Sequence, residues 1–233
     1  MNTDPPLAAV VFDLDGVLIE SEHLWEEMWT RYAERFGGTW TAEDTAHVQG
    51  MSAPEWSSYL AERVGSGESA AACERAVVTD MVEALDAGRM EPYTGAADMV
   101  RTVAGRVPTA LATSAPRRLI DAVLDRHGLT ASFRATVSSA EVERGKPNPD
   151  VYLEAARRLE TDPIRCVGVE DSSNGLRAAH AAGMTVVAIP NPTYPPKPDA
   201  LGLAARVADG VDSARREILE LLDGAPAASG VAR

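Results

Sequence analysis

The chain has 233 residues, of which 45% are hydrophobic, so it can bury a sizeable core and is neither a disordered nor a fibrous protein. Its net charge of −13 argues against non-specific binding to nucleic acid or an anionic membrane, because both need a basic surface. The sequence contains no run of about 18 apolar residues and no signal-peptide core, so we expect a cytoplasmic protein, with Cys73 and Cys166 as free thiols.

Short apolar runs recur along the chain, and a longer helical pattern follows each of them. The expected strands are Ala8–Phe12, Val107–Ala112, Ala135–Val137, Cys166–Val169, Met184–Ile189 and Arg206–Ala208. Continuous apolar runs are typical of strands buried on both faces, and helices between such runs are typical of parallel βαβ crossovers. The sequence therefore predicts an α/β fold with a doubly wound parallel sheet.

The first two expected strands are separated by about 90 residues, although a crossover needs only one helix. Helical spacing of apolar residues over Ser21–Gly38, two capping boxes at Thr41–Asp44 and Ser52–Glu55, and a long helix over Ser69–Ala87 predict a small inserted helical bundle. We expect residues 1–20 and 92–223 to form the α/β core domain, residues 21–91 to form an inserted helical domain, and residues 224–233 to form a flexible tail.

All four tryptophans fall in the predicted insert: Trp25, Trp29, Trp40 and Trp56. A small bundle needs large apolar side chains to build a core, and this is the interpretation that we favour. The alternative is that one or two of these rings line a substrate pocket.

Polar residues follow the ends of several expected strands. They are Asp13 and Asp15, Thr113 and Ser114, Lys146, and Glu170 and Asp171. Each pair alone could be a turn or a helix cap. Ligands of open α/β sheets bind beyond the carboxyl ends of the strands, however, and four acids, a hydroxyl pair and one of only two lysines at one rim point to chemistry.

Several carboxylates around one point repel each other unless a hard cation neutralises them, and Mg²⁺ prefers oxygen ligands. A metal-assisted phosphoryl site would explain the pattern. One aspartate can attack phosphorus, while the other, two residues away, protonates the leaving oxygen and later activates water. Lys146 and the Thr113 hydroxyl would offset charge on the phosphoryl oxygens.

These motifs together resemble the haloacid dehalogenase-like hydrolase superfamily over about Val10 to Ile189. The matching segments are DLDGVL at 13–18, ATS at 112–114, GKPNPD at 145–150 and GVEDSSNG at 168–175. The resemblance implies a Rossmann-like core with a helical cap over the substrate, and it is strongest to β-phosphoglucomutase-like phosphatases. In that family the insert at 21–91 would be the cap domain.

The resemblance also implies roles for single residues. Asp13 would be the nucleophile and Asp15 the acid/base. Thr113, Ser114 and Lys146 would contact the phosphate. The Mg²⁺ ligands would be Asp13, the Asp15 carbonyl and Asp171, with Glu170 in the ligand set or beside it. His23 would either pack at the cap hinge or contact the substrate.

Three positions bear on the reaction class. Haloacid dehalogenases lack an aspartate at the position of Asp15, because halide leaves without a proton. The mutase pattern places a histidine ten residues after this aspartate and an arginine just after a Gly-Val-Ser turn, where this chain has Trp25 and Ala53. Hydrolysis is therefore favoured over mutase chemistry.

We expect a Mg²⁺-dependent phosphatase that hydrolyses a small phosphorylated metabolite, a sugar phosphate, through an aspartyl-phosphate intermediate. One alternative is a phosphosugar mutase of the β-phosphoglucomutase type. A less favoured alternative is a phosphoacceptor signalling domain, since such domains place adjacent acids after the first strand and lack this insert. We expect no nucleic-acid or membrane partner, and a monomer or weak homo-oligomer.

Overall fold

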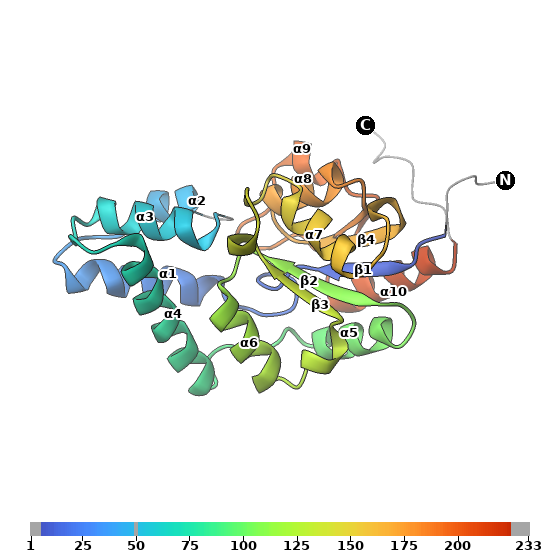
Figure 1. Ribbon diagram of the computed structural model, residues 1–233, viewed down its shortest axis with the longest axis horizontal. Coiled ribbons are helices and arrows are strands. Elements are labelled where there is room, and N and C mark those ends of the chain that lie inside the picture. The colour runs from blue at the N-terminus through green and yellow to red at the C-terminus, as the bar shows by residue number, and fades with distance from the viewer. Residues whose placement is uncertain (1–5, 49–50, 225–233) are drawn as a thin grey trace.

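Six parallel strands form one sheet in the part of the chain that the computed structural model describes, residues 6–48 and 51–224 (Figure 1). The strands are β1 Ala9–Phe12, β2 Thr109–Thr113, β3 Ala135–Ser138, β4 Cys166–Glu170, β5 Thr185–Ala188 and β6 Arg206–Val207. Their order is β3-β2-β1-β4-β5-β6. The predicted doubly wound sheet is confirmed, and each expected strand lies within two residues of its predicted ends.

Helices cover both faces of the sheet. They are α5 Ala96–Ala104, α6 Arg117–Arg126 and α10 Val211–Leu222 on one face, and α7 Asp150–Arg158, α8 Ser173–Ala181 and α9 Pro198–Leu201 on the other. Val10 and Phe12 of β1 pack with the first group, whereas Ala9 and Val11 pack with the second. Burial on both faces explains why β1 is a continuous apolar run instead of an alternating one.

Strand β1 lies at the point where the order of the strands in the sheet reverses. Strands β2 and β3 lie on one side of it, and β4, β5 and β6 lie on the other. Phe12, the last residue of β1, is in register with Leu111 of β2 and Val169 of β4. The residues that follow these positions therefore meet at one edge of the sheet, which is where open α/β sheets bind ligands.

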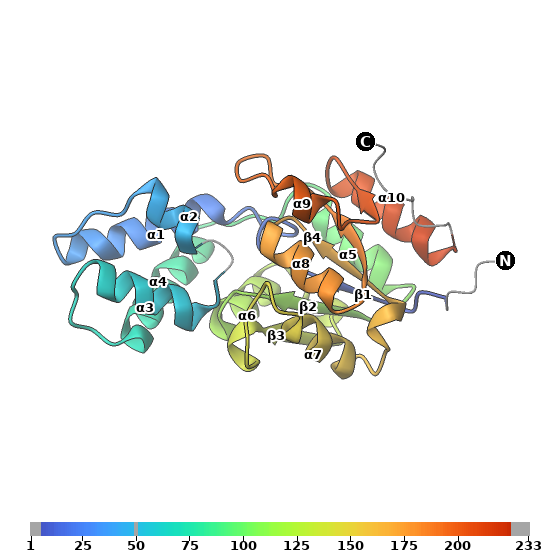
Figure 2. The same cartoon turned by 90° about the horizontal axis from the view of Figure 1, so that it is seen from above.

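Four helices of the predicted insert lie together at one end of the molecule, beside the sheet (Figures 1 and 2). They are α1 Glu22–Arg35, α2 Ala42–Val48, α3 Ala53–Arg63 and α4 Ala70–Asp86. Both predicted capping boxes are present: the Thr41 amide donates to Asp44 Oδ2 at 3.0 Å, and the Ser52 amide donates to Glu55 Oε2 at 2.8 Å. The predicted tail, apart from Gly224, lies outside the described residues.

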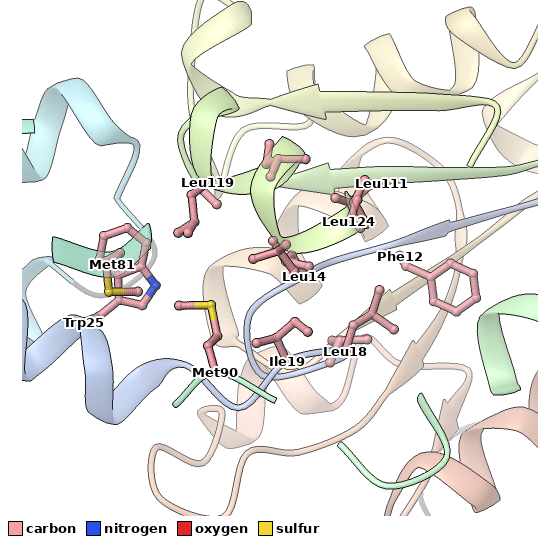
Figure 3. Packing of buried hydrophobic residues seen from close by; sticks show 14 of the residues in the cluster. Phe12, Leu14, Leu18, Ile19, Trp25, Met81, Met90, Leu111, Leu119 and Leu124 are labelled. Atoms are coloured by element: carbon pink, nitrogen blue, oxygen red, sulfur yellow. The ribbon is translucent and has the colours of Figure 1, made fainter. Parts of the chain in front are cut away.

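One apolar cluster joins the helical insert to the sheet (Figure 3). It runs from Phe12 through Leu14 and Met90 to Trp25 and Met81. The tryptophans at 25, 29 and 56 are buried members of this cluster, and the one at 40 packs against it, which confirms the interpretation of these rings as core. The insert is therefore held against the sheet by packing.

Both cysteines are buried and free, as expected. No helix within residues 6–48 and 51–224 has both the length and the apolar character needed to cross a membrane.

Asp44 ties the second helix of the insert to the third. Its carboxylate accepts hydrogen bonds from the Tyr59 hydroxyl at 2.6 Å, from Arg63 Nε at 3.0 Å and from the Thr41 backbone. Burial alone would raise the pKa of Asp44, but these hydrogen bonds outweigh it and lower the pKa to about 2. The ionised form is thus built into the fold of the insert.

We expect Asp44→Asn to lower the free energy of unfolding at neutral pH by about 1–3 kcal/mol, because it weakens hydrogen bonds to a charged group. The folded-state pKa of Asp44 is depressed. Its contribution is therefore complete above the unfolded pKa of about 3.9 and is lost as the pH falls towards 2. Urea unfolding of both proteins at several pH values measures this difference. A difference that stays constant down to pH 2 would contradict the assignment.

Candidate active site

A cavity lies where the carboxyl ends of β1, β2 and β4 face α1, α2 and α3. Six of the eight predicted site residues line it: Asp13, Asp15, Thr113, Ser114, Lys146 and Asp171. They come from four separate stretches of the chain. The fold therefore brings together residues at or after the ends of β1, β2, β3 and β4.

Asp13 and Asp15 are placed by the end of β1 and a tight turn. The Asp13 amide donates to the Val169 carbonyl of β4 at 3.0 Å, so the sheet ladder continues to this residue. Gly16 follows with a positive φ of 76°, and a Cβ atom at this position would overlap the Asp171 carboxylate. Glycine is needed here both for the backbone conformation and for the approach of the acid.

Lys146 lies buried between two acids. Its Nζ is 3.0 Å from Asp13 Oδ1 and 2.6 Å from Glu170 Oε1. Burial disfavours the charged ammonium, but the two carboxylates outweigh this and raise the Lys146 pKa above its ordinary value. The lysine therefore stays charged beside Asp13.

Glu170 is the most heavily hydrogen-bonded acid of the site. Its Oε1 accepts from Lys146 and from the Tyr152 hydroxyl at 2.7 Å, and its Oε2 accepts from the Asp171 amide at 3.1 Å and the Ser172 hydroxyl at 3.2 Å. A Cβ atom at Gly175 would overlap this carboxylate. Glu170 thus holds Lys146 and the loop after β4 in place.

Three buried carboxylates gather at this edge, and a divalent cation would suit them. Oxygen atoms of Asp13, Glu170 and Asp171 lie within 4.8 Å of one another. Burial, and then the neighbouring acids, raise the pKa of Asp171 well above its ordinary value. Burial also raises that of Asp13, to about 7 despite the attraction of Lys146. One lysine cannot balance three acids, so the donor set fits Mg²⁺.

Asp15 is held on one carboxylate oxygen by two donors. The Ser21 hydroxyl and Trp25 Nε1, the latter at 3.0 Å, both donate to Asp15 Oδ1. From the sequence, Trp25 was expected to be a core or pocket-lining ring and marked a departure from the mutase pattern, but no contact with Asp15 was predicted for it, and Ser21 was not a predicted site residue. The spacing of four residues at the start of α1 is the signal that could have shown both donors to share one face.

Two further residues, Asn191 and Tyr152, make contacts at the site that were not predicted. Asn191 donates to Asp171 Oδ2 at 3.3 Å and also to the Glu22 carboxylate, which lines the cavity. Tyr152 reaches Glu170 from α7. Neither residue carries a sequence signal for this role, because a buried tyrosine on an amphipathic helix resembles core and Asn191 opens a proline-rich loop.

The structure does not bring His23 to the site. Its side chain is exposed on α1 and is absent from the cavity lining, so substrate contact by His23 is not supported. The physical reason is helical periodicity: Glu22, Trp25 and Trp29 lie three and four residues apart and face the cavity, which turns His23 away from it. Three of the four tryptophans, at 25, 29 and 56, line the cavity as well as belonging to the core, where the alternative interpretation expected one or two rings to line a pocket.

Comparison with known proteins agrees with the family that the sequence motifs resemble. A family model described as haloacid dehalogenase-like hydrolase matches residues 7–183. A phosphorylated carbohydrates phosphatase of Thermotoga maritima is 31% identical over 179 residues, which are 76% of this chain and 82% of that protein. A bifunctional riboflavin kinase/FMN phosphatase of Arabidopsis thaliana is 31% identical over 79% of this chain, which spans only 48% of that longer protein.

The fold has a close match among solved structures. A β-phosphoglucomutase from Clostridium difficile superposes with a TM-score of 0.79 and 22% identity, and the match covers 94% of this chain and 98% of that one. At this identity the likeness concerns the fold alone.

We expect Mg²⁺ to raise the melting temperature, because binding to the folded acids compensates their repulsion. At about ten times its Kd, Mg²⁺ would stabilise the fold by about 1.4 kcal/mol, or about 3–6 °C for a chain of this size. Asp171→Asn should abolish this shift without lowering the melting temperature in chelator, since it also relieves repulsion.

The matched control is Asp86→Asn, which removes an exposed carboxylate at the end of α4. This variant should keep the full Mg²⁺ shift in differential scanning fluorimetry. An unchanged shift in Asp171→Asn would contradict a metal site at these acids.

Proposed function

Because the chain belongs to the haloacid dehalogenase-like hydrolase family and is a phosphoric monoester hydrolase, we propose that it is a Mg²⁺-dependent phosphatase of small sugar phosphates that works through an aspartyl-phosphate on Asp13. The observation that carries the proposal is the meeting of Asp13, Asp15 and Lys146 in one cavity beside a buried acidic cluster. The similarity to a phosphorylated carbohydrates phosphatase supports the substrate class.

The first step of the proposed reaction transfers the phosphoryl group to Asp13. A carboxylate oxygen of Asp13 attacks phosphorus, and the bond from phosphorus to the leaving oxygen breaks as Asp15 gives that oxygen a proton. Lys146 lies 3.0 Å from Asp13 and favours the ionised carboxylate that attack requires. The Thr113 hydroxyl, at the end of β2, would contact the phosphoryl oxygens.

The second step releases inorganic phosphate. Asp15, now ionised, takes a proton from a water molecule that attacks the phosphorus of the aspartyl-phosphate, and the bond to the Asp13 oxygen breaks. Asp15 ends the cycle protonated and Asp13 ionised, so the proton balance closes over the two steps. The two donors on Asp15 Oδ1 hold the residue in position to serve both steps.

Asp13 and Asp171 would hold the metal with carboxylate oxygens, and the Asp15 carbonyl is a further proposed ligand. Bound Mg²⁺ would supply positive charge against the phosphoryl oxygens. Glu170 already accepts hydrogen bonds on both oxygens, which supports a place beside the ligand set in preference to one inside it. We further propose that residues 21–91 act as the cap that closes this cavity.

Asp13→Asn should abolish turnover, because an amide cannot attack phosphorus. We expect kcat for p-nitrophenyl phosphate with Mg²⁺ to fall by roughly 10³-fold or more. Circular dichroism and urea unfolding should show that the fold survives, since the substitution keeps the shape of the side chain. Retained activity in the folded variant would refute the proposed nucleophile.

Trp25→Phe should weaken general-acid catalysis, because it removes one of the two donors that position Asp15. Alkyl phosphates need a proton on the leaving oxygen, whereas p-nitrophenolate leaves without one. We expect kcat/KM to fall about 10-fold or more for alkyl phosphates and less than about 3-fold for p-nitrophenyl phosphate. A plot of log kcat/KM against leaving-group pKa should therefore become steeper.

Trp40→Phe is the matched control for this series. Trp40 is also a tryptophan of the insert, but its Nε1 donates to Thr45 at 3.0 Å, and the ring is not part of the cavity lining. Its plot should keep the wild-type slope. An equal loss on all phosphates in Trp25→Phe would assign Trp25 to packing alone.

A further inference from the structure

The helical insert contributes a wall to the cavity that differs in chemistry from the catalytic end. The lining residues of the insert are Glu22, Trp25 and Trp29 from α1, Thr45 and Val48 from α2, Met51 from the α2–α3 connection, and Trp56 from α3. Glu22, the first residue of α1, is the one charged residue among them, and all the others except Thr45 are apolar or aromatic. Beyond Glu22, the cavity thus joins a strongly charged end at the sheet to an uncharged wall at the insert.

Three of the lining residues of this wall are tryptophans whose indole rings pack together. The ring centroid of Trp25 lies 5.6 Å from that of Trp29 and 5.7 Å from that of Trp56, and Trp29 and Trp56 are 6.0 Å apart. Each ring is nearly buried, with 9%, 7% and 3% of its residue exposed. Such packed aromatic faces offer rigid apolar area at little entropic cost, and they suit a ligand with a face of C–H groups.

Two polar groups on this wall can serve a neutral ligand. Thr45 Oγ1 accepts a hydrogen bond from Trp40, which leaves its own proton to donate. Trp29 Nε1 is buried and has no acceptor among the described residues. Both are donors, so both suit hydroxyl or ether oxygens of the ligand.

None of the residues that the structure describes in this wall carries a positive charge. Among the described lining residues the single cation is Lys146, which is already paired with Asp13 and Glu170. Glu22 adds a further acid to the lining. A second anionic group on the leaving side of the ligand would lose water and meet acids instead of a cation, which is unfavourable.

Resting on the proposed phosphatase function, we infer that the three-tryptophan wall, formed by Trp25, Trp29 and Trp56, selects an uncharged leaving group. The substrate class is then the monophosphate of a neutral sugar or polyol. Sugar bisphosphates and phosphorylated sugar acids are rejected, because the wall offers no cation for their second charge.

Matched substrate pairs test the inference. Fructose 6-phosphate and fructose 1,6-bisphosphate differ by one phosphate, and glucose 6-phosphate and 6-phosphogluconate differ mainly by a carboxylate. We expect kcat/KM of the wild-type enzyme with Mg²⁺ to be at least about 10-fold higher for fructose 6-phosphate and for glucose 6-phosphate, whose leaving groups are uncharged, than for the other member of each pair. A factor of this size is typical of a buried charge that is left without a partner. Equal values within both pairs would overturn the inference.

A variant with an added positive charge in the cavity tests the same inference in the opposite direction, because it should improve the hydrolysis of substrates with a second anionic group. Met51→Arg places a positive charge in the cavity lining and should narrow the ratio within each pair by about 10-fold. Phe36→Arg adds the same charge at an exposed position of the insert outside the lining and should leave the ratios unchanged. Identical ratios in a folded Met51→Arg enzyme would count against the charge argument.

The aromatic part of the wall is tested through substrate binding. Trp56→Leu should raise KM for neutral sugar monophosphates about 10-fold while kcat changes less than about 3-fold, because the ring contacts the leaving group and not the reacting atoms. A fall in kcat with unchanged KM would contradict this role.

Failure of the inference can be separated from failure of the proposed function. Suppose that the wild-type enzyme hydrolyses p-nitrophenyl phosphate and that Asp13→Asn abolishes this activity. If the wild-type enzyme then hydrolyses sugar phosphates with charged and uncharged leaving groups equally well, or hydrolyses none with an uncharged leaving group, only the substrate class is wrong. If it releases phosphate from none of these compounds, the proposed function fails, and the inference fails with it.

Discussion

The buried ammonium of Lys146 between Asp13 and Glu170 is the interaction on which the rest of the site depends. Without it, three carboxylates would share a low-dielectric edge of the sheet with no internal compensation. Much of the surrounding structure serves this arrangement. Tyr152 and the loop after β4 satisfy the remaining lone pairs of Glu170, and glycines at 16 and 175 leave room for the carboxylates. The remaining negative charge is what makes the site suited to a divalent cation.

The helical insert has two functions that are physically linked. Trp25, Trp29 and Trp56 belong to the apolar cluster that joins the insert to the sheet, and the same three rings line the cavity. Trp25 combines both, because its ring packs with Trp29 and Trp56 while its Nε1 donates to Asp15. The position of the proposed acid/base is thus coupled to the packing of the insert, and the chemistry of the wall is set by residues that the fold needs anyway.

Much of the fold could be predicted because its signals are local. Strand β1 is apolar on both sides because helices cover both faces of the sheet. The capping boxes that begin at Thr41 and Ser52 are patterns of four residues, and each marks the start of a helix. The predicted residues that do meet in the cavity all stand directly after strands or in short motifs. His23 is not part of the cavity lining, because adjacent residues on a helix point about 100° apart and its neighbour Glu22 faces the cavity.

The sequence by itself determined the succession of strands and helices along the chain, the two aspartates after β1 and the presence of an insert. Each of these features depends on residues that are close in the chain. Only the tertiary structure decided which side chains meet. It brought Tyr152 to Glu170, Asn191 to Asp171, and the Trp25 donor to Asp15. Contacts between segments that are far apart in the sequence leave no local pattern in it. The same holds for side chains such as Tyr152 and Trp25, which look like ordinary core residues in the sequence. Such contacts arise from the packing of whole elements.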